Sequence, residues 1–274
     1  MNYEVFQYPF MQRAFLIGTV AAVPFGLIGT FIVVRRIGYL AGAVAHCAFG
    51  GIGIGLYLQY LFAATVFAPL FPPSAVSFVV TVLAAMLIGA IRIKAKERED
   101  TIIGAVWVIG MALGLILLDK TPGSTSISSY LFGDIILLTQ SDVYLTAALS
   151  AVVLAVTAVF FQRLGAVCFD AEFAQLRGVP TTWYFQLLLV LTAITVVLFV
   201  RVIGILLLIA MLTLPAAAAC RFANRLFPTA CLAVLFAMVS SWLGLFLSVQ
   251  FSVPAGSAIV LTAAVFYTVS LLRK

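Results

Sequence analysis

The stretch AFLIGTVAAVPFGLIGTFIVVRR, residues 14–36, carries no charged side chain until it reaches Arg35 and Arg36. An α-helix needs about 20 apolar residues to cross the hydrocarbon core of a bilayer. An uncharged run of this length, closed by two arginines, is typical of a membrane-spanning helix that ends at the lipid–water interface. The stretch therefore predicts a membrane protein.

The composition of the whole chain supports this interpretation. Of its 274 residues, 65% are hydrophobic and only 9% are charged, and the mean hydropathy is +1.24. Soluble domains carry roughly 25% charged residues, so this chain cannot cover a water-facing surface and a soluble globular domain is excluded. We expect no cleaved signal peptide, because the first apolar run is too long and lacks a small-residue cleavage site.

About nine apolar segments predict an all-α, polytopic transmembrane bundle that forms a single domain over residues 1–274. Their apolar runs are continuous and lack the period-two alternation of barrel strands, so helices are favoured over a β-barrel. The sixth and seventh segments meet at Arg201. The nine segments lie at about 12–34, 38–61, 74–91, 102–118, 143–162, 184–200, 202–219, 227–248 and 256–272.

The basic residues fall mostly in alternate loops. Twelve of the 15 follow the odd-numbered segments, and these are Arg35, Arg36, Arg92, Lys94, Lys96, Arg98, Arg163, Arg177, Arg221, Arg225, Arg273 and Lys274. The other side carries only Arg13, Lys120 and Arg201. Because cytoplasmic loops are enriched in Lys and Arg, this pattern predicts an external N-terminus and a cytoplasmic C-terminus. The net charge of +6 lies in these short loops, so it does not indicate a nucleic-acid partner.

His46, the only histidine in the chain, lies in the middle of the second segment. An ionisable side chain inside a bilayer is costly and usually marks a functional site. Neutral imidazole is a good ligand for zinc and for other first-row transition metals. A histidine at this position can equally be a hydrogen-bonded core residue at a contact between helices, and the residue alone leaves both interpretations open.

Glycines crowd the segment that contains His46. Small residues let helix backbones approach one another closely, and they also leave space beside a transport pathway. Both interpretations place the second segment at the centre of the bundle, away from lipid. The glycines are Gly38, Gly42, Gly50, Gly51, Gly53 and Gly55.

The stretch FDAEFAQLRGVP, residues 169–180, predicts a short helix within the basic loop at about 163–182. Asp170 is placed to cap the N-terminus of this helix, because its carboxylate can accept a hydrogen bond from a free backbone N–H. Glu172 lies in the first turn, where a negative charge suits the helix dipole.

The other end of this predicted helix also has clear signals. Arg177 falls in the last turn, Gly178 can adopt the left-handed conformation that ends a helix, and Pro180 prevents continuation. Phe173 and Leu176 share one face because they are three residues apart. The helix is therefore amphipathic, and it either connects two membrane segments along the surface or docks a soluble cytoplasmic partner.

Motifs of soluble catalysis are missing from the sequence. There is no GxxxxGK[ST] phosphate-binding loop, so the chain cannot hydrolyse ATP by that route. HExxH and GxSxG are also missing, and no pair of intramembrane aspartates indicates a protease. We therefore expect a protein that is not itself an enzyme.

Six stretches follow one another along most of the chain, namely RRIGYLAGAVAHCAFGGIGIG (35–55), REDTIIGAVWVIGMALGLILL (98–118), SISSYLFGDIILLTQSDV (126–143), FDAEFAQLRGVP (169–180), RVIGILLLIAMLTLPAAAA (201–219) and VPAGSAIVL (253–261). In this order they resemble the permease subunit of the zinc/manganese/iron family of bacterial ABC importers. The resemblance implies a fold like that of the vitamin B12-type importer permeases, in the bacterial inner membrane.

The resemblance also implies partners and a substrate. Two copies of the permease would form a homodimer around a central pathway, two ABC ATPase subunits would bind on the cytoplasmic side, and an external binding protein would deliver the metal. The transported substrate would be a zinc, manganese or iron ion, with no other bound cofactor. The stretch 169–180 would contact the ATPase, with Asp170, Glu172, Phe173, Leu176, Arg177 and Gly178 as its coupling residues.

The chain departs from the family pattern at two places. The family commonly carries an aspartate four residues before the histidine, on the same helix face, and Gly42 stands there instead. The final external turn commonly reads Asp-Leu-Pro, and here it begins at Ser252. Either His46 and backbone carbonyls hold the ion more weakly, or the substrate is not a bare divalent ion. Gly42, Gly50 and Ser252 are the candidate pathway-lining positions.

Two other functions stay open on the sequence. A secondary transporter driven by an ion gradient usually keeps acidic residues in the membrane, and none is found in these segments. A non-transporting scaffold or sensor subunit is compatible with the missing aspartate. The sequence identifies neither the metal nor, apart from the resemblance, the direction of transport.

Overall fold

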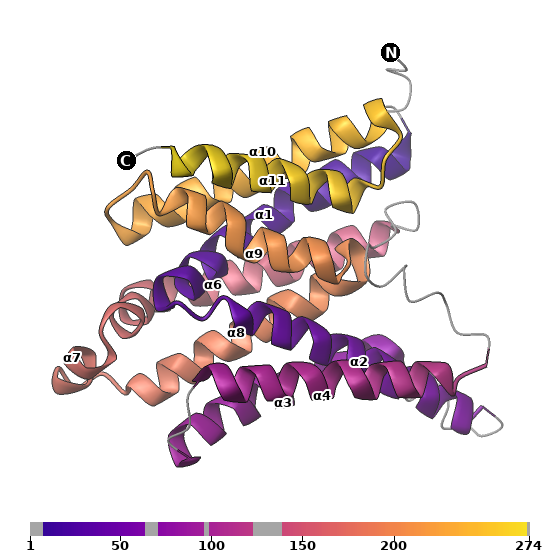
Figure 1. Cartoon of the computed structure of the whole chain (residues 1–274), viewed down its shortest axis with the longest axis horizontal. Coiled ribbons are helices and arrows are strands. Elements are labelled where there is room, and N and C mark those ends of the chain that lie inside the picture. The colour runs from indigo at the N-terminus through magenta and orange to yellow at the C-terminus, as the bar shows by residue number, and fades with distance from the viewer. Residues whose placement is uncertain (1–7, 64–70, 96–98, 123–138, 273–274) are drawn as a thin grey trace.

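The computed structural model describes residues 8–63, 71–95, 99–122 and 139–272, and within these ranges it contains helices and no strand (Figure 1). Most of the stretch 126–143 and the last two residues lie outside the described part. The helices are α1 (Pro9–Arg35), α2 (Tyr39–Leu61), α3 (Pro73–Ala95), α4 (Glu99–Asp119), α6 (Gln140–Phe169), α7 (Ala171–Leu176), α8 (Thr181–Ile203), α9 (Ile205–Ala219), α10 (Leu226–Phe251) and α11 (Ala255–Leu271).

Each of the nine predicted segments corresponds to one of these helices. Helices α1, α2, α3, α4, α6 and α10 are long and apolar enough to cross a membrane. The other three segments correspond to shorter apolar stretches, Thr181–Val197 of α8, Ile205–Ala219 and Ala255–Leu271. The prediction of an all-α, polytopic bundle is confirmed for the described residues.

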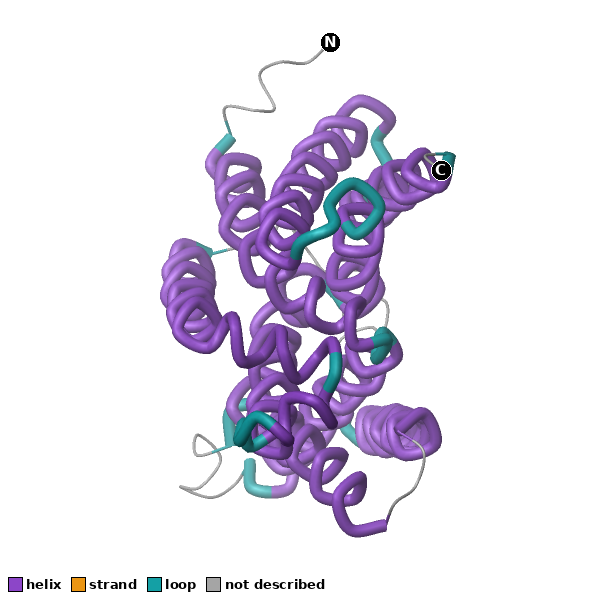
Figure 2. The backbone as a smooth tube through the Cα atoms, turned by 90° about the vertical axis from the view of Figure 1, so that its left-hand side faces the viewer, coloured by secondary structure: helices purple, strands orange, loops and turns teal. Residues whose placement is uncertain are grey.

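The helices lie side by side along one direction of the molecule (Figure 1), and Figure 2 looks along the bundle from the end at which α7 lies. The C-terminal ends of α1, α3, α9 and α11 lie at the α7 end, whereas α1 begins at the opposite end. The described helix ends next to the loops that carry most of the basic residues therefore lie at one end of the bundle. That this end faces the cytoplasm stays a prediction from the charge pattern.

Helices α8 and α9 are separated by a single residue, Gly204, at which the chain reverses direction (Figure 1). The sequence placed this junction at Arg201. Gly204 has φ 83° and ψ 161°, a backbone conformation that is essentially restricted to glycine. The junction is therefore fixed by the one residue that tolerates the turn, and the preceding arginine belongs to α8.

Replacing Gly204 with alanine is expected to destabilise the bundle, because a Cβ atom strains the backbone in this conformation. The cost of such a residue is about 1–3 kcal/mol, which should lower the melting temperature of the purified protein. Gly104→Ala is the matched control, because its added Cβ would have no neighbour within 4 Å. Equal melting temperatures for both variants would show that the turn relaxes without strain.

The glycines of α2 allow α4 to approach its backbone directly. A Cβ atom at Gly50 would lie 2.6 Å from the carbonyl oxygen of Gly110, and one at Gly53 would lie 2.7 Å from the carbonyl oxygen of Gly114. Real Cβ atoms do not come this close to other atoms, so only glycine fits. The spacing of the two α4 glycines is the small-xxx-small pattern of closely packed membrane helices.

The neighbouring face of α2 packs against α3 in the same way. A Cβ atom at Gly51 would lie 2.5 Å from the Cα of Ser77, and one at Gly55 would lie 2.6 Å from the Cα of Pro73. The Ser77 hydroxyl also donates a hydrogen bond of 2.7 Å to the carbonyl oxygen of Ala48. Helix α2 is thus held between α3 and α4, which confirms that the glycine-rich segment lies inside the bundle.

Candidate functional site

His46 lies on the buried part of α2, with only 9% of its surface exposed. Its imidazole stacks on the indole of Trp107 from α4, with the ring centroids 5.0 Å apart and the planes 26° apart. The Nδ1 atom is buried and has no hydrogen-bond partner among the described residues. The ring is therefore held by stacking, and Nδ1 remains available to a ligand.

Gly42 lies one helical turn before His46 and faces the same indole. A Cβ atom at Gly42 would lie 2.5 Å from Cζ3 of Trp107. The indole therefore occupies the space that a side chain at residue 42 would enter. Gly42 faces Trp107 and Gly50 faces Gly110, so both of these candidate pathway positions pack against α4.

The sequence did not indicate Trp107 as part of this site. It stands within the stretch 98–118, but its contact with α2 depends on the tertiary packing of α2 on α4. The described residues contain no group of three or more His, Cys, Asp or Glu side chains that could hold a metal ion. Among the described residues, His46 therefore does not belong to a cluster of such side chains.

Ser252 lies in the turn between α10 and α11, at the end of the bundle opposite α7 (Figure 1). Its backbone adopts the left-handed conformation, with φ 52°. The Val253 N–H donates to the carbonyl oxygen of Ser248 (3.2 Å), and the Ser248 hydroxyl donates to the carbonyl oxygen of Val253 (2.7 Å). The turn is therefore closed by its own hydrogen bonds, and Ser252 itself is exposed.

The short helix predicted within residues 169–180 is present as α7. The Asp170 carboxylate accepts a hydrogen bond of 2.9 Å from the backbone N–H of Phe173, as expected of a capping residue. Glu172 lies in the first turn. The N-terminal half of the prediction is therefore confirmed in detail.

The end of α7 has the predicted glycine stop. Gly178 has φ 78°, its N–H donates to the carbonyl oxygen of Gln175 (2.9 Å), and the Val179 N–H donates to that of Ala174 (3.1 Å). These two hydrogen bonds form a Schellman motif. Arg177, expected in the last turn, is instead the C-capping residue.

The predicted loop at 163–182 is shorter in the structure, because α6 continues as far as Phe169. Leu164, Val167 and Cys168 are buried in this extension, so packing sustains the helix beyond the apolar run. Arg163 donates a hydrogen bond of 2.7 Å to the hydroxyl of Tyr184 on α8. Only residues 170–180 separate α6 from α8, which fixes the position of α7 closely.

Three apolar side chains on and beside α7 are exposed. The exposed fractions are 66% for Phe169, 54% for Phe173 and 87% for Leu176, whereas Ala174 on the other face is buried. The Arg177 guanidinium lies 4.9 Å from the centre of the Phe173 ring. We call Phe169, Phe173 and Leu176 the α7 patch. Exposed apolar patches bordered by polar groups are typical of protein-docking surfaces.

Comparison with known proteins identifies the family of this chain. The model of the ABC 3 transport family matches residues 7–274. This chain belongs to the ABC 3 transport family. The resemblance seen in six separate stretches is therefore confirmed at the level of the family.

Several known proteins are similar to this chain over nearly their whole length. A protein of Chlamydia trachomatis, named "Probable metal transport system membrane protein", is 36% identical over 97% of this chain and 89% of its own. The manganese import system permease protein ScaB of Streptococcus parasanguinis is 31% identical over 96% of this chain and 90% of its own. The solved structure of PsaBC from Streptococcus pneumoniae in complex with a Fab matches with a TM-score of 0.83 and 32% identity, over 98% of this chain and 93% of that one.

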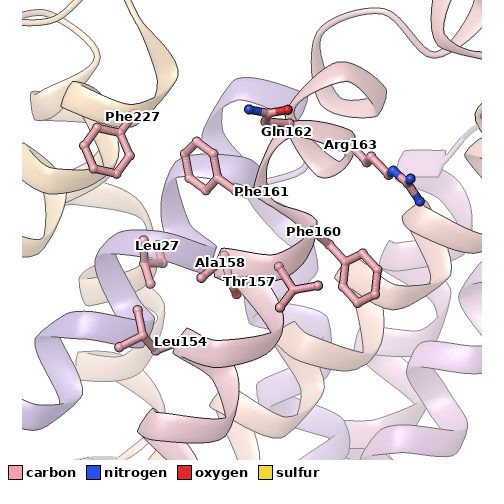
Figure 3. Close-up of a pocket in the computed structure, with 10 residues that line it drawn as sticks. Leu27, Leu154, Thr157, Ala158, Phe160, Phe161, Gln162, Arg163 and Phe227 are labelled. Atoms are coloured by element: carbon pink, nitrogen blue, oxygen red, sulfur yellow. The ribbon is translucent and has the colours of Figure 1, made fainter.

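A groove of about 690 Å³ in this ABC 3 family chain lies beside α6, between α1 and α10. Figure 3 shows Phe161 and Phe227 pointing toward one another on one side of α6, and Arg163 on the other. The lining is mostly apolar and includes a guanidinium, which repels a cation. His46 does not line this groove, so the groove is not the candidate metal site.

Replacing Asp170 with alanine is expected to loosen α7 without unfolding the bundle. Losing an N-cap costs about 1 kcal/mol of helix stability, which is a large share for a helix of 6 residues. Hydrogen–deuterium exchange of residues 171–176 should therefore accelerate about fivefold, while the melting temperature of the whole protein changes little. Asp142→Ala, which removes the N3 carboxylate of the α6 capping box formed with Thr139, is the control and should leave exchange in α7 unchanged.

Proposed function

We propose that this chain is the membrane permease subunit of an ABC importer that moves a divalent transition-metal ion across the bacterial inner membrane. Its N-terminus lies outside and its C-terminus in the cytoplasm. Family membership, the similarity to ScaB and PsaBC, and the capped helix α7 with its exposed apolar patch support this function. Helix α7 is the main observation, because hydrogen bonds close both of its ends and no described element covers its apolar patch.

The proposed coupling works through α7. The α7 patch docks on a cytoplasmic ATPase subunit, while Asp170, Glu172 and Gly178 hold the helix in shape and Arg177 covers Phe173. Because the sequence has no phosphate-binding loop, ATP hydrolysis belongs to that separate subunit. Two copies of the permease enclose the pathway, and an external metal-binding protein supplies the ion.

The proposed substrate is manganese, zinc or iron. Manganese is included because the names of relatives such as ScaB and the Listeria monocytogenes protein MntC, which is 30% identical over 97% of this chain, refer to it. His46 contacts the ion transiently through its buried imidazole. Gly42 and Gly50 lie at the contact between α4 and α2, the helix that carries His46. Ser252 lies at the external opening of the pathway.

Uptake by the complete complex tests this function. The permease, its ATPase and its binding protein are reconstituted in liposomes with ATP inside or outside, and uptake of radioactive Mn²⁺, Zn²⁺ and Fe²⁺ is measured. We expect ATP-dependent uptake of at least one of these ions. Uptake that follows an ion gradient without ATP would identify a secondary transporter, and no uptake of any of the three ions would reject metal import.

His46→Ala is expected to reduce uptake about tenfold, because losing one ion contact of about 1.4 kcal/mol weakens binding by that factor. Ser240→Ala is the matched control, since Ser240 on α10 also has a buried hydroxyl without a hydrogen-bond partner among the described residues. The control should transport normally. Normal uptake by the His46 variant would remove this residue from the mechanism while leaving the proposed function intact.

A further inference from the structure

Trp107 is the side chain that joins Gly42 and His46 into one structural unit. Its indole stacks beside the imidazole. The same ring lies where a side chain at residue 42 would begin, with Cζ3 at 2.5 Å, Cη2 at 2.6 Å and Cε3 at 3.2 Å from an added Cβ. A side chain at residue 42 and the Trp107 indole in this orientation therefore exclude each other.

The backbone cannot relieve this exclusion by moving α4 away. Gly50 and Gly53 hold α2 in direct backbone contact with Gly110 and Gly114, within two turns of Trp107. The Cys47 thiol adds a hydrogen bond of 3.6 Å to the carbonyl oxygen of Val106. Because the distance between the helices is fixed, a ligand at 42 requires the Trp107 indole to move aside or to be replaced by a smaller residue.

The stacked ring also restricts His46. An imidazole lying nearly parallel to an indole cannot rotate freely about its Cβ–Cγ bond, so Nδ1 is presented in one orientation. That atom is buried and has no hydrogen-bond partner among the described residues. Only 9% of the surface of His46 is exposed. An ion there meets an imidazole nitrogen and an aromatic face, and the adjacent turn of α2 supplies no carboxylate.

We infer that Trp107 determines ion selectivity at this site, by closing residue 42 to a side-chain ligand and by orienting the His46 imidazole. Imidazole suits zinc, iron, copper and nickel, whereas carboxylate oxygens suit manganese, magnesium and calcium. A site with imidazole and no neighbouring carboxylate therefore favours Zn²⁺ and Fe²⁺ over Mn²⁺. Trp107 is a positioning residue, and the inference rests on the proposed function because it requires the ion to pass His46.

Paired substitutions test the exclusion of residue 42 independently of transport. Gly42→Asp alone should lower the melting temperature of the purified permease, because its Cβ overlaps the indole. Adding Trp107→Ala should restore most of that loss, so the two changes should be strongly non-additive. Trp242→Ala, which removes a tryptophan on α10, is the control and should restore nothing. Additive effects, or an undisturbed Gly42→Asp protein, would overturn the steric coupling.

Competitive uptake tests selectivity. Liposomes with the complete complex receive Mn²⁺ and Zn²⁺ together, and the ratio of the two ions taken up is compared between variants. The Gly42→Asp/Trp107→Ala protein should shift this ratio at least tenfold toward Mn²⁺, and Trp242→Ala should not shift it. An unchanged ratio in a transporting double variant would overturn the inference alone, whereas no uptake of any ion by the wild type would refute the proposed function.

Fluorescence gives a direct readout of the pair. In a Trp183→Phe/Trp242→Phe protein, Trp107 is the one remaining tryptophan, since the chain has three. Co²⁺ should quench its emission in lipid nanodiscs, Zn²⁺ should reverse the quenching more effectively than Mn²⁺, and His46→Ala should abolish it. Quenching that persists without His46, or that Mn²⁺ and Zn²⁺ reverse equally, would contradict the inference.

Discussion

Gly50→Leu is expected to prevent the permease from folding into a stable bundle. The Cβ of residue 50 would lie 2.6 Å from the carbonyl oxygen of Gly110, and a backbone atom inside a helix cannot move aside as a side chain does. Overpacking a core with extra methylene groups costs about 1–3 kcal/mol, and the enforced separation of two helices adds to that cost. Size-exclusion chromatography should show little monodisperse protein, with a strongly lowered melting temperature.

The control for this prediction is Gly104→Leu. Gly104 lies on α4 like Gly110, but an added Cβ would meet nothing within 4 Å, and leucine is well suited to an apolar helix in lipid. Its yield and melting temperature should match those of the wild type. If Gly50→Leu behaved as well as this control, the direct contact between the α2 and α4 backbones would be wrong.

Leu176→Asp is expected to abolish ATPase binding and metal uptake while leaving the permease folded. Leu176 is 87% exposed, so the permease has little to lose when the side chain is changed. A central apolar anchor of an interface contributes at least about 2 kcal/mol, which corresponds to about 30-fold weaker binding, and burying a carboxylate adds to this. Co-purification of the ATPase and ATP-dependent uptake measure the effect, with the melting temperature as the check on folding.

Leu272→Asp separates the α7 patch from the surrounding surface. Leu272 is 83% exposed and follows α11 at the same end of the bundle. This variant places the same charge on the same face but outside the α7 patch, so it should bind the ATPase normally. Equal losses in the two variants would mean that charge at this end of the bundle, rather than the patch, weakens the complex.

The sequence predicted α7 well because helix capping is local. Asp170 contacts a backbone group three residues away, and the conformation of Gly178 depends on its own missing Cβ. The burial of α2 could also be predicted, because repeated glycines in an apolar helix usually mark close contacts with neighbouring helices. The contact of Trp107 with Gly42 and His46 could not, because it joins two helices whose register depends on packing across the whole bundle.

Helix ends were predicted less well for a related physical reason. The apolar run of α6 ends near Arg163, but the helix continues to Phe169 because Val167 and Cys168 are buried by neighbouring elements. Hydropathy reports where a chain leaves lipid and does not report where it stops being helical. In the same way, the charge of Arg201 suggested a junction that the backbone makes at Gly204.

The glycine contacts on two faces of α2 constrain how this permease can change shape. Contacts between backbones contain no rotamers to rearrange, so α2, α3 and α4 should travel as one block during each cycle. Movement of this block relative to the rest of the bundle would then occur at its contacts with α8 and α9, which are made by side chains. Because His46 and Trp107 both belong to this block, their relative geometry would stay constant between the outward-open and inward-open states. The cycle would then alternate exposure of the ion while its intrinsic affinity for the imidazole stays the same.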